Sequence, residues 1–145
     1  MPDDRDNHIM NKFIKAQEAV YGKVLSELRA GHKQTHWMWF IFPQIDGLGR
    51  SPTALHYAVK NIKEAQQYLN HPVLGARLMQ CTEIMLDLDN TSALAVFGKI
   101  DAMKFKSSMT LFMLAADSDS VFEKVLDKYF NGERDSKTLE ILNYK

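Results

Sequence analysis

The chain has 145 residues, of which 46% are apolar and 25% are charged, a balance typical of one soluble globular domain. Its 18 lysines and arginines equal its 18 aspartates and glutamates in number, so it lacks the basic excess that binding to a nucleic acid backbone requires, and we expect no nucleic acid partner. The longest apolar run, residues 37–42, is far shorter than the ~20 residues that span a bilayer, so we expect no membrane partner.

The single cysteine, Cys81, cannot form an internal disulfide, which is typical of a protein in a reduced, cytoplasmic setting. The first seven residues are acidic and polar, whereas a signal peptide is basic and then apolar. We therefore expect a cytoplasmic protein, with a flexible segment over residues 1–7 and one helical domain over residues 8–145. We expect a monomer or a weak oligomer.

Residues 8–30 carry apolar side chains at every third or fourth position, which predicts one long amphipathic helix. Asp6 or Asn7 can cap the start of this helix, and Gly31 can adopt the left-handed conformation past its end.

Residues 36–44 form an aromatic stretch, HWMWFIFPQ, which holds both tryptophans of the chain. A short apolar run fits a buried strand or a buried helix. Thr35 as a possible cap favours a helix, as does the lack of a convincing partner strand elsewhere, and Pro43 ends the element in either case. A loop with two glycines follows, and Ser51-Pro52 is a typical helix start.

The rest of the chain is divided by capping residues into short helical segments. Starts are predicted at Ser51, Asn61, His71, Ser92, Asp101, Ser120 and Asp135, and ends at Gly98 and Gly132. Ser120 and Glu123 have the spacing of a capping box. No segment of useful length alternates between apolar and polar residues, so the sequence predicts an all-α, single compact domain of about seven to eight mostly short helices around one aromatic-rich core.

Several familiar motifs are excluded by residue. His32 and His36 have helical spacing, but the zinc-protease motif needs a glutamate where Lys33 stands, and Gly31 breaks the helix that would align the two rings. No dinucleotide fingerprint, phosphate loop or nucleophile elbow is present. We expect neither a metal site nor a cofactor.

Arg50 and Ser51 lie where a glycine turn meets the start of a predicted helix. Free backbone amides and the helix dipole favour an anion at such a position, and the Arg50 guanidinium can donate two hydrogen bonds to it. His56 lies about one turn further along the same helix. The alternative is that the glycines only make the turn and Arg50 pairs with a carboxylate.

Lys104, Ser107 and Ser108 lie in a segment that is otherwise strongly apolar. Serine favours caps over helix interiors, so these side chains present a cation and hydroxyls to a polar ligand, or they bond back to preceding carbonyls and permit close helix packing. Both interpretations stay open.

Two functional hypotheses follow. In the first, a pocket binds a small anionic ligand, such as a nucleotide or an ADP-ribose-like molecule. If the protein is an enzyme, hydrolysis is the hypothesised reaction, and His36 or His56 carries the proton because imidazole titrates near neutral pH. The predicted ligand-binding residues are Trp37, Trp39, Gln44, Arg50, Ser51, Lys104, Ser107 and Ser108. In the second hypothesis the chain is a non-enzymatic helical interaction module, in which the same residues are core and caps.

The sequence resembles the domain-of-unknown-function 1810 family over nearly the whole chain, from Phe13 to Leu142. The residues that carry the resemblance are Gly31-x-Lys33-x-x-His36-Trp37-Met38-Trp39-Phe40-x-Phe42-Pro43-Gln44, Gly47-Leu48-Gly49-x-Ser51, His71-Pro72-x-Leu74-Gly75 and Ser107-Ser108-Met109-Thr110-Leu111-Phe112. The resemblance implies a small, mostly helical bacterial protein and no known activity.

A shorter likeness concerns Gly49-Arg50 and Lys104-Phe105, whose arrangement is similar to that of the NADAR family, which acts on ADP-ribose-type N-glycosides. This likeness implies an acidic residue in the site, for which Glu64 and Asp101 are the candidates.

Overall fold

The computed structural model describes residues 4–144, with side chains from residue 9 onward, and these residues form nine α-helices. In chain order the helices are α1 (Asp4–Glu18), α2 (Tyr21–Arg29), α3 (Met38–Ile41), α4 (Pro52–Tyr57), α5 (Ile62–Asn70), α6 (Leu74–Asp87), α7 (Ala93–Ala115), α8 (Val121–Phe130) and α9 (Ser136–Ile141).

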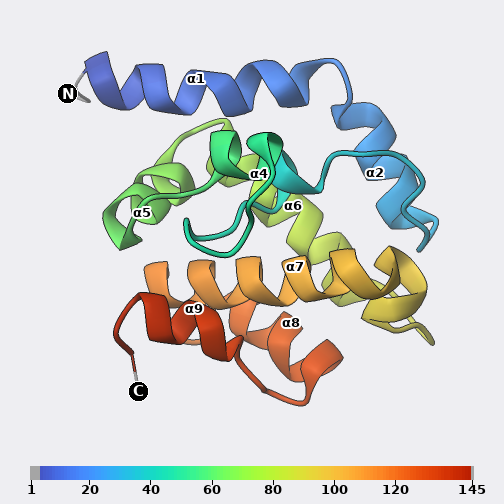
Figure 1. The fold of residues 1–145 in the computed structure, drawn as a ribbon. Coiled ribbons are helices and arrows are strands. Elements are labelled where there is room, and N and C mark those ends of the chain that lie inside the picture. The colour runs from blue at the N-terminus through green and yellow to red at the C-terminus, as the bar shows by residue number, and fades with distance from the viewer. Residues whose placement is uncertain (1–3, 145) are drawn as a thin grey trace.

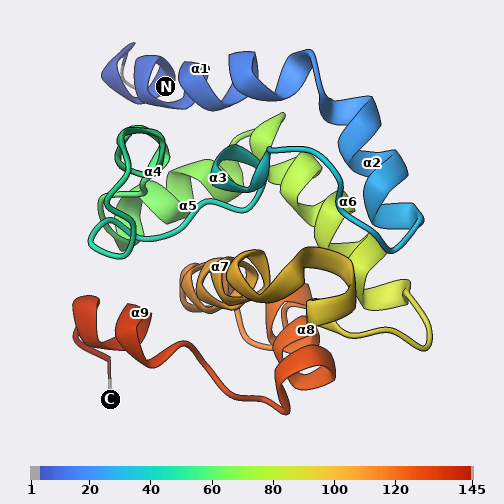
Figure 2. The ribbon, with the colours of Figure 1, turned by 45° about the vertical axis from the view of Figure 1, so that its right-hand side comes forward.

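Helix α7 is the centre of the fold, since it contacts α3, α5, α8 and α9. In Figure 1, α1 runs along the top of the molecule, α7 crosses its middle and α8 and α9 lie below α7. Figure 2 shows α5 and α6 in the layer between α1 and α7. Helix α6 joins the two sides of the molecule, because it packs against α2 as well as against α8.

The centre of the core holds aromatic rings that pack at tilted or edge-to-face angles. Phe42 lies 4.9 Å from Phe105 and 6.2 Å from both Trp37 and Phe97, measured between ring centroids. All four rings are buried, so the aromatic stretch and the first half of α7 form one cluster. The predicted fold class, all-α around an aromatic-rich core, is confirmed.

The described residues contain no strand, and their β-type pairing is a single bridge between Ile45 and Val59. Asp46 N–H donates to the Val59 carbonyl at 2.7 Å, and Val59 N–H donates to the Gln44 carbonyl at 2.8 Å. The bridge closes the base of the loop that carries the glycine turn and α4.

The single helix predicted over residues 8–30 is wrong, because a turn at residues 19–20 divides it into α1 and α2. Helix α1 begins at Asp4, before the predicted start. The Gln17 amide at its end donates to the Phe40 carbonyl at 2.7 Å, which fixes α1 against α3, whereas α2 packs on α6. The turn thus lets α1 and α2 pack against different neighbours.

The predicted end at Gly31 is confirmed, and its geometry is that of a Schellman motif. Gly31 has a φ of 71°. Its N–H donates to the Leu28 carbonyl at 2.9 Å, and the His32 N–H donates to the Glu27 carbonyl at 3.0 Å.

The aromatic stretch is helical for only four residues, in α3, and Thr35 does not cap it. Trp37 occupies the capping position without a side-chain hydrogen bond. The Thr35 hydroxyl donates instead to the Glu27 carboxylate at 2.6 Å, because the loop turns back onto α2 before α3 begins.

The predicted caps at Ser51, Asn61, Ser92 and Asp135 are confirmed, since each side chain accepts a backbone N–H three residues later. The capping box is confirmed in one half. Ser120 Oγ accepts from the Glu123 N–H, whereas the Glu123 carboxylate accepts from the N–H of Asp119 and not from that of Ser120.

No helix within residues 4–144 is long and apolar enough to cross a membrane. Residues 1–3 of the predicted flexible segment lie outside the described residues, and the flexibility of residues 1–7 stays a prediction.

Candidate functional site

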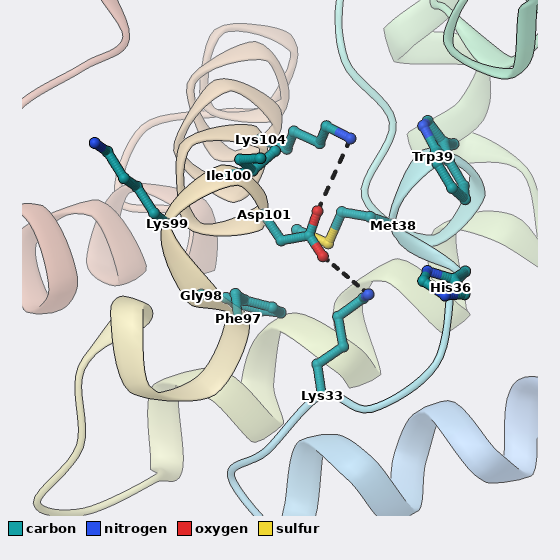
Figure 3. Close-up of a pocket in the computed structure, with 10 residues that line it drawn as sticks. All are labelled: Lys33, His36, Met38, Trp39, Phe97, Gly98, Lys99, Ile100, Asp101 and Lys104. Carbon is teal, nitrogen blue, oxygen red and sulfur yellow. Dashed lines mark ion pairs between the residues drawn. The ribbon is translucent and has the colours of Figure 1, made fainter. Parts of the chain in front are cut away.

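A pocket of about 460 Å³ lies between the loop that follows α2, the start of α3 and the first half of α7. Figure 3 shows His36 and Trp39 on one side of this pocket and α7 on the other. We call it the lysine pocket. It is lined by Lys33, His36, Met38, Trp39, Phe97, Gly98, Lys99, Ile100, Asp101 and Lys104.

The wall formed by α7 depends on a kink at Gly98, where φ is 80° and ψ is 170°. The non-helical Gly98 divides α7 into two helical segments, of which the second begins at Lys99. The predicted helix end at Gly98 is therefore confirmed, whereas Asp101 lies in the first turn of the second segment and is not its cap. This position turns the Asp101 side chain toward the pocket (Figure 3).

Asp101 lies between two lysines. Its Oδ2 is 2.9 Å from Lys33 Nζ, and its Oδ1 is 3.9 Å from Lys104 Nζ (Figure 3). The exposed fractions of the side chains are 8% for Lys33, 22% for Asp101 and 26% for Lys104, so this cluster is largely shielded from bulk water. Shielding strengthens its electrostatic interactions.

Each of the two lysines also lies over one tryptophan of the aromatic stretch. Lys33 Nζ is 5.1 Å from the Trp37 ring centroid, and Lys104 Nζ is 5.1 Å from that of Trp39. Cations at this distance from an indole ring are attracted by its electron-rich face. The tryptophans thus help to hold the two ammonium groups on either side of Asp101.

The loop that carries Lys33 is held by Glu27, a buried carboxylate on α2. Glu27 accepts hydrogen bonds from the Gln34 N–H at 2.7 Å, the Thr35 N–H at 3.0 Å, the Thr35 hydroxyl and the Trp37 indole N–H at 3.0 Å. The Lys33 N–H donates to the Val96 carbonyl at 2.8 Å, which ties the loop to α7. The position of Lys33 is therefore determined by buried polar contacts.

These bonds also determine the ionisation of Glu27. Burial by itself raises the pKa of the carboxyl group, and the hydrogen bonds donated by Thr35, Gln34 and Trp37 outweigh burial and lower the pKa to about 2. Glu27 is therefore a charged acceptor at neutral pH, which strengthens each bond that it receives.

The charge of the pocket favours an anion. Two ammonium groups face one carboxylate, and Lys99 lines the rim with its side chain directed away from this cluster (Figure 3). Lys33 and Asp101 form the shorter ion pair, while Lys104 is held more loosely. Of the two lysines beside Asp101, Lys104 thus has the greater freedom to turn toward a ligand.

A second, smaller hollow adjoins the lysine pocket. It has a volume of about 300 Å³ and shares Ile100 and Lys104 with its neighbour. We call it the side pocket. Its lining residues are Gln44, Leu48, Gly49, Ile100, Met103, Lys104, Ser107, Asp135 and Lys137.

Of the residues expected from the sequence, five line these two pockets. His36 and Trp39 line the lysine pocket, Gln44 and Ser107 line the side pocket, and Lys104 lines both. The structure therefore brings together side chains from the aromatic stretch and from α7, which are about sixty residues apart in the sequence.

The other expected residues lie elsewhere. Trp37 and Ser108 are completely buried in the core. Arg50, Ser51 and His56 are exposed at α4 and line neither pocket. Ser51 accepts the Ala54 N–H as the cap of α4, and the structure thus gives it a local role.

The two serines of α7 differ in their contacts. Ser107 Oγ donates to the Met103 carbonyl at 3.1 Å, one turn earlier, as one of the two interpretations expected. Ser108 Oγ has no hydrogen-bond partner among the described residues.

Sequence reasoning did not assign Lys33 to the site, and it treated Asp101 mainly as a helix cap. A usable signal was the order Gly98, Asp101, Lys104, since a glycine kink followed by opposite charges three residues apart places both charges on one helix face. Glu64, the other acidic candidate, lies away from both pockets. It accepts the Lys60 N–H at 3.4 Å near the start of α5.

Comparison with known proteins gives the family and the fold but no activity. A family model described as "Protein of unknown function (DUF1810)" matches residues 7–142, which confirms the resemblance inferred from the sequence. A similar solved structure is that of the conserved hypothetical protein Rv1873 from Mycobacterium tuberculosis. The two chains are 44% identical with a TM-score of 0.91, and the match covers 94% of this chain and 97% of the other. No protein with a curated description matches the chain.

Proposed function

Because the chain belongs to the DUF1810 family of proteins of unknown function, we propose from its own geometry that it binds a small anionic ligand in the lysine pocket. The observation that carries the proposal is the cluster of Lys33, Asp101 and Lys104. It places an excess of positive charge in a partly shielded, aromatic-walled hollow of about 460 Å³, a volume within the range typical of small-molecule sites.

Lys104 is the residue that contacts the anion. Its distance of 3.9 Å from Asp101 is longer than that of a direct hydrogen-bonded ion pair, so turning toward a ligand costs little. Lys33 stays on Asp101 at 2.9 Å and keeps the carboxylate from repelling the incoming anion.

Trp39 forms the aromatic wall of the lysine pocket. Its ring is half-buried and its centroid lies 5.1 Å from Lys104 Nζ, so it shields the ammonium group and a bound anion from water. A phosphorylated small molecule, such as a nucleotide or an ADP-ribose-like compound, matches the charge and the volume of this hollow.

If the ligand is hydrolysed, His36 carries the proton. His36 lines the same pocket as Asp101, whereas His56 lies on α4 outside it. Asp101, which is ion-paired with two lysines, acts as an acceptor of hydrogen bonds.

The proposal is tested by the melting temperature of the protein in the presence of pyrophosphate, nucleotides, sugar phosphates and ADP-ribose. A ligand that binds only the folded state at a hundred times its Kd adds about 2.7 kcal/mol to stability, and this raises the Tm by roughly 10 °C for a domain of this size. We expect at least one anion of the panel to raise the Tm and Lys104→Ala to abolish that increase.

Two variants serve as controls. Lys124→Ala removes an exposed lysine of α8 and should leave the ligand-induced shift intact. Arg50→Ala should also leave it intact, since Arg50 lies outside the lysine pocket. A shift that survives Lys104→Ala, or a panel without any shift, would contradict the proposal and favour the non-enzymatic interaction module.

A further inference from the structure

We propose that the ligand is elongated and occupies both pockets, with its anionic group in the lysine pocket and an uncharged, hydroxyl-bearing organic part in the side pocket. This inference rests on the proposed function. The class of molecule with this composition is a nucleoside phosphate or a closely similar phosphate ester.

The two pockets are adjacent along one face of α7. Ile100 and Lys104 line both of them, whereas Ser107 lines only the side pocket. These positions are spaced by three or four residues, so they form a row on one side of the helix. A ligand that follows this row passes Lys104 in the middle.

Two exposed apolar side chains line the side pocket. Ile100 and Met103 are 70% and 63% exposed, although most large apolar side chains of the described chain are covered. A ligand that covers these side chains is bound more tightly, because each Å² of apolar surface removed from water stabilises the complex by about 25 cal/mol.

The side pocket also has polar lining residues. Gln44 contributes an amide, which is a donor and an acceptor, and Asp135 contributes a carboxylate whose Oδ2 already accepts from Thr138. Ser107 donates to a backbone carbonyl and keeps lone pairs that accept. Groups of this kind bind hydroxyl and amino groups.

The charges of the two pockets differ. Apart from Lys104, which both pockets share, the charged residues of the side pocket are Lys137 and Asp135, and their charges cancel. In the cluster of the lysine pocket, the two positive charges of Lys33 and Lys104 are offset by only one negative charge, that of Asp101. The anionic end of the ligand therefore belongs in the lysine pocket, and the uncharged end belongs in the side pocket.

The loop that carries Gln44 and Gly49 is held in place independently of any ligand. The bridge between Ile45 and Val59 fixes its base. A Cβ atom on Gly49 would come within 2.5 Å of the Ala54 Cβ, so the glycine permits the loop to pack closely on α4. The side pocket is thus present before a ligand binds.

The test compares pyrophosphate with the diphosphates ADP, GDP, CDP and UDP by calorimetric titration. All five carry the diphosphate group, and only four carry a nucleoside. We expect at least one nucleoside diphosphate to bind about ten-fold more tightly than pyrophosphate, because it also covers Ile100 and Met103.

Met103→Ser is the diagnostic variant. It should lower the affinity for the nucleoside diphosphate about five- to ten-fold and change the affinity for pyrophosphate by less than about two-fold. Leu94→Ser is the matched control, since Leu94 is 62% exposed on α7 and lines neither pocket, and it should change neither affinity.

The outcomes separate the two proposals. Binding of pyrophosphate that depends on Lys104, without a gain from any nucleoside or without an effect of Met103→Ser, overturns the elongated ligand and leaves the anion site in place. No binding of any of the five compounds overturns both.

Discussion

Glu27 illustrates how one side chain can organise a site that it does not touch. It lies on α2, outside both pockets, yet it accepts hydrogen bonds from Gln34, Thr35 and Trp37, which follow Lys33 in the chain. A buried carboxylate that receives several hydrogen bonds is costly to alter, because each donor would be left without a partner.

Glu27→Gln is therefore expected to destabilise the protein by about 2–3 kcal/mol, since glutamine offers one acceptor oxygen and places an NH₂ group against existing donors. Urea unfolding of the variant and the wild type measures the difference. Glu83→Gln, at an exposed position of α6, is the matched control and should change stability by less than about 0.5 kcal/mol. Equal effects of the two substitutions would show that the hydrogen bonds of Glu27 contribute little.

The two tryptophans show the limit of residue-level prediction. Trp37 and Trp39 are only two positions apart, yet Trp37 is completely buried and Trp39 lines the pocket. The sequence identified both as important and could not assign core and surface, because the stretch contains a loop and a four-residue helix and thus has no regular period.

At the scale of elements, the connection from α5 to α6 depends on Gly75. A Cβ atom at this position would lie 2.0 Å from the Leu69 carbonyl oxygen and 2.9 Å from its carbonyl carbon. The close neighbours belong to the backbone at the end of α5, so they cannot move aside as a flexible side chain could.

Gly75→Ala should destabilise the protein by at least about 2 kcal/mol, because α5 and α6 must separate to admit the methyl group. Gly22→Ala is the matched control. Gly22 lies in α2 with no atom within 4 Å of an added Cβ, and alanine there should be neutral or stabilise the helix by about 0.5–1 kcal/mol. Thermal unfolding of both variants measures the contrast, and a Gly75→Ala protein as stable as the wild type would refute the steric argument.

The sequence predicted the starts of helices best, and it predicted worst whether a long helical segment is interrupted. A capping side chain bonds an amide three residues away, so Ser51, Asn61 and Ser92 carry their information locally. The turn at residues 19–20 has no such local signal. It exists because α1 and α2 have different packing partners.

At the scale of the whole molecule, stability should depend on pH through buried groups whose pKa values differ between the folded and unfolded states. Hydrogen bonding lowers the pKa of Glu27 from 4.5 to about 2, so its stabilisation is complete above about pH 4.5 and is lost as the pH falls toward 2. Burial lowers the pKa of His71 from 6.5, so a further loss begins as the pH falls below that value. Burial raises the pKa of the Cys81 thiol from 9 to about 12, so the corresponding stabilisation is lost as the pH rises above 9.

We therefore expect the free energy of unfolding to be greatest between about pH 7 and pH 8.5 and to fall on both sides. The midpoint of urea unfolding, measured from pH 3 to pH 10, tests this. The pKa shift of Glu27 corresponds to roughly 3 kcal/mol of stability. Glu27→Gln should therefore reduce the decline in the free energy of unfolding between pH 5 and pH 3. An acid decline of the same size in that variant would assign it to other carboxylates.

The sequence by itself determined the all-α class, most helix starts, the left-handed helix end at Gly31 and the family, because caps, glycine conformations and motifs act over a few residues. Only the tertiary structure decided which polar residues meet. Lys33 reaches Asp101 because the α2–α3 loop folds back onto α7 and Gly98 bends that helix, whereas Arg50 lies outside the pocket. Contacts between residues so far apart depend on how the helices pack around one core, and no local pattern contains that information.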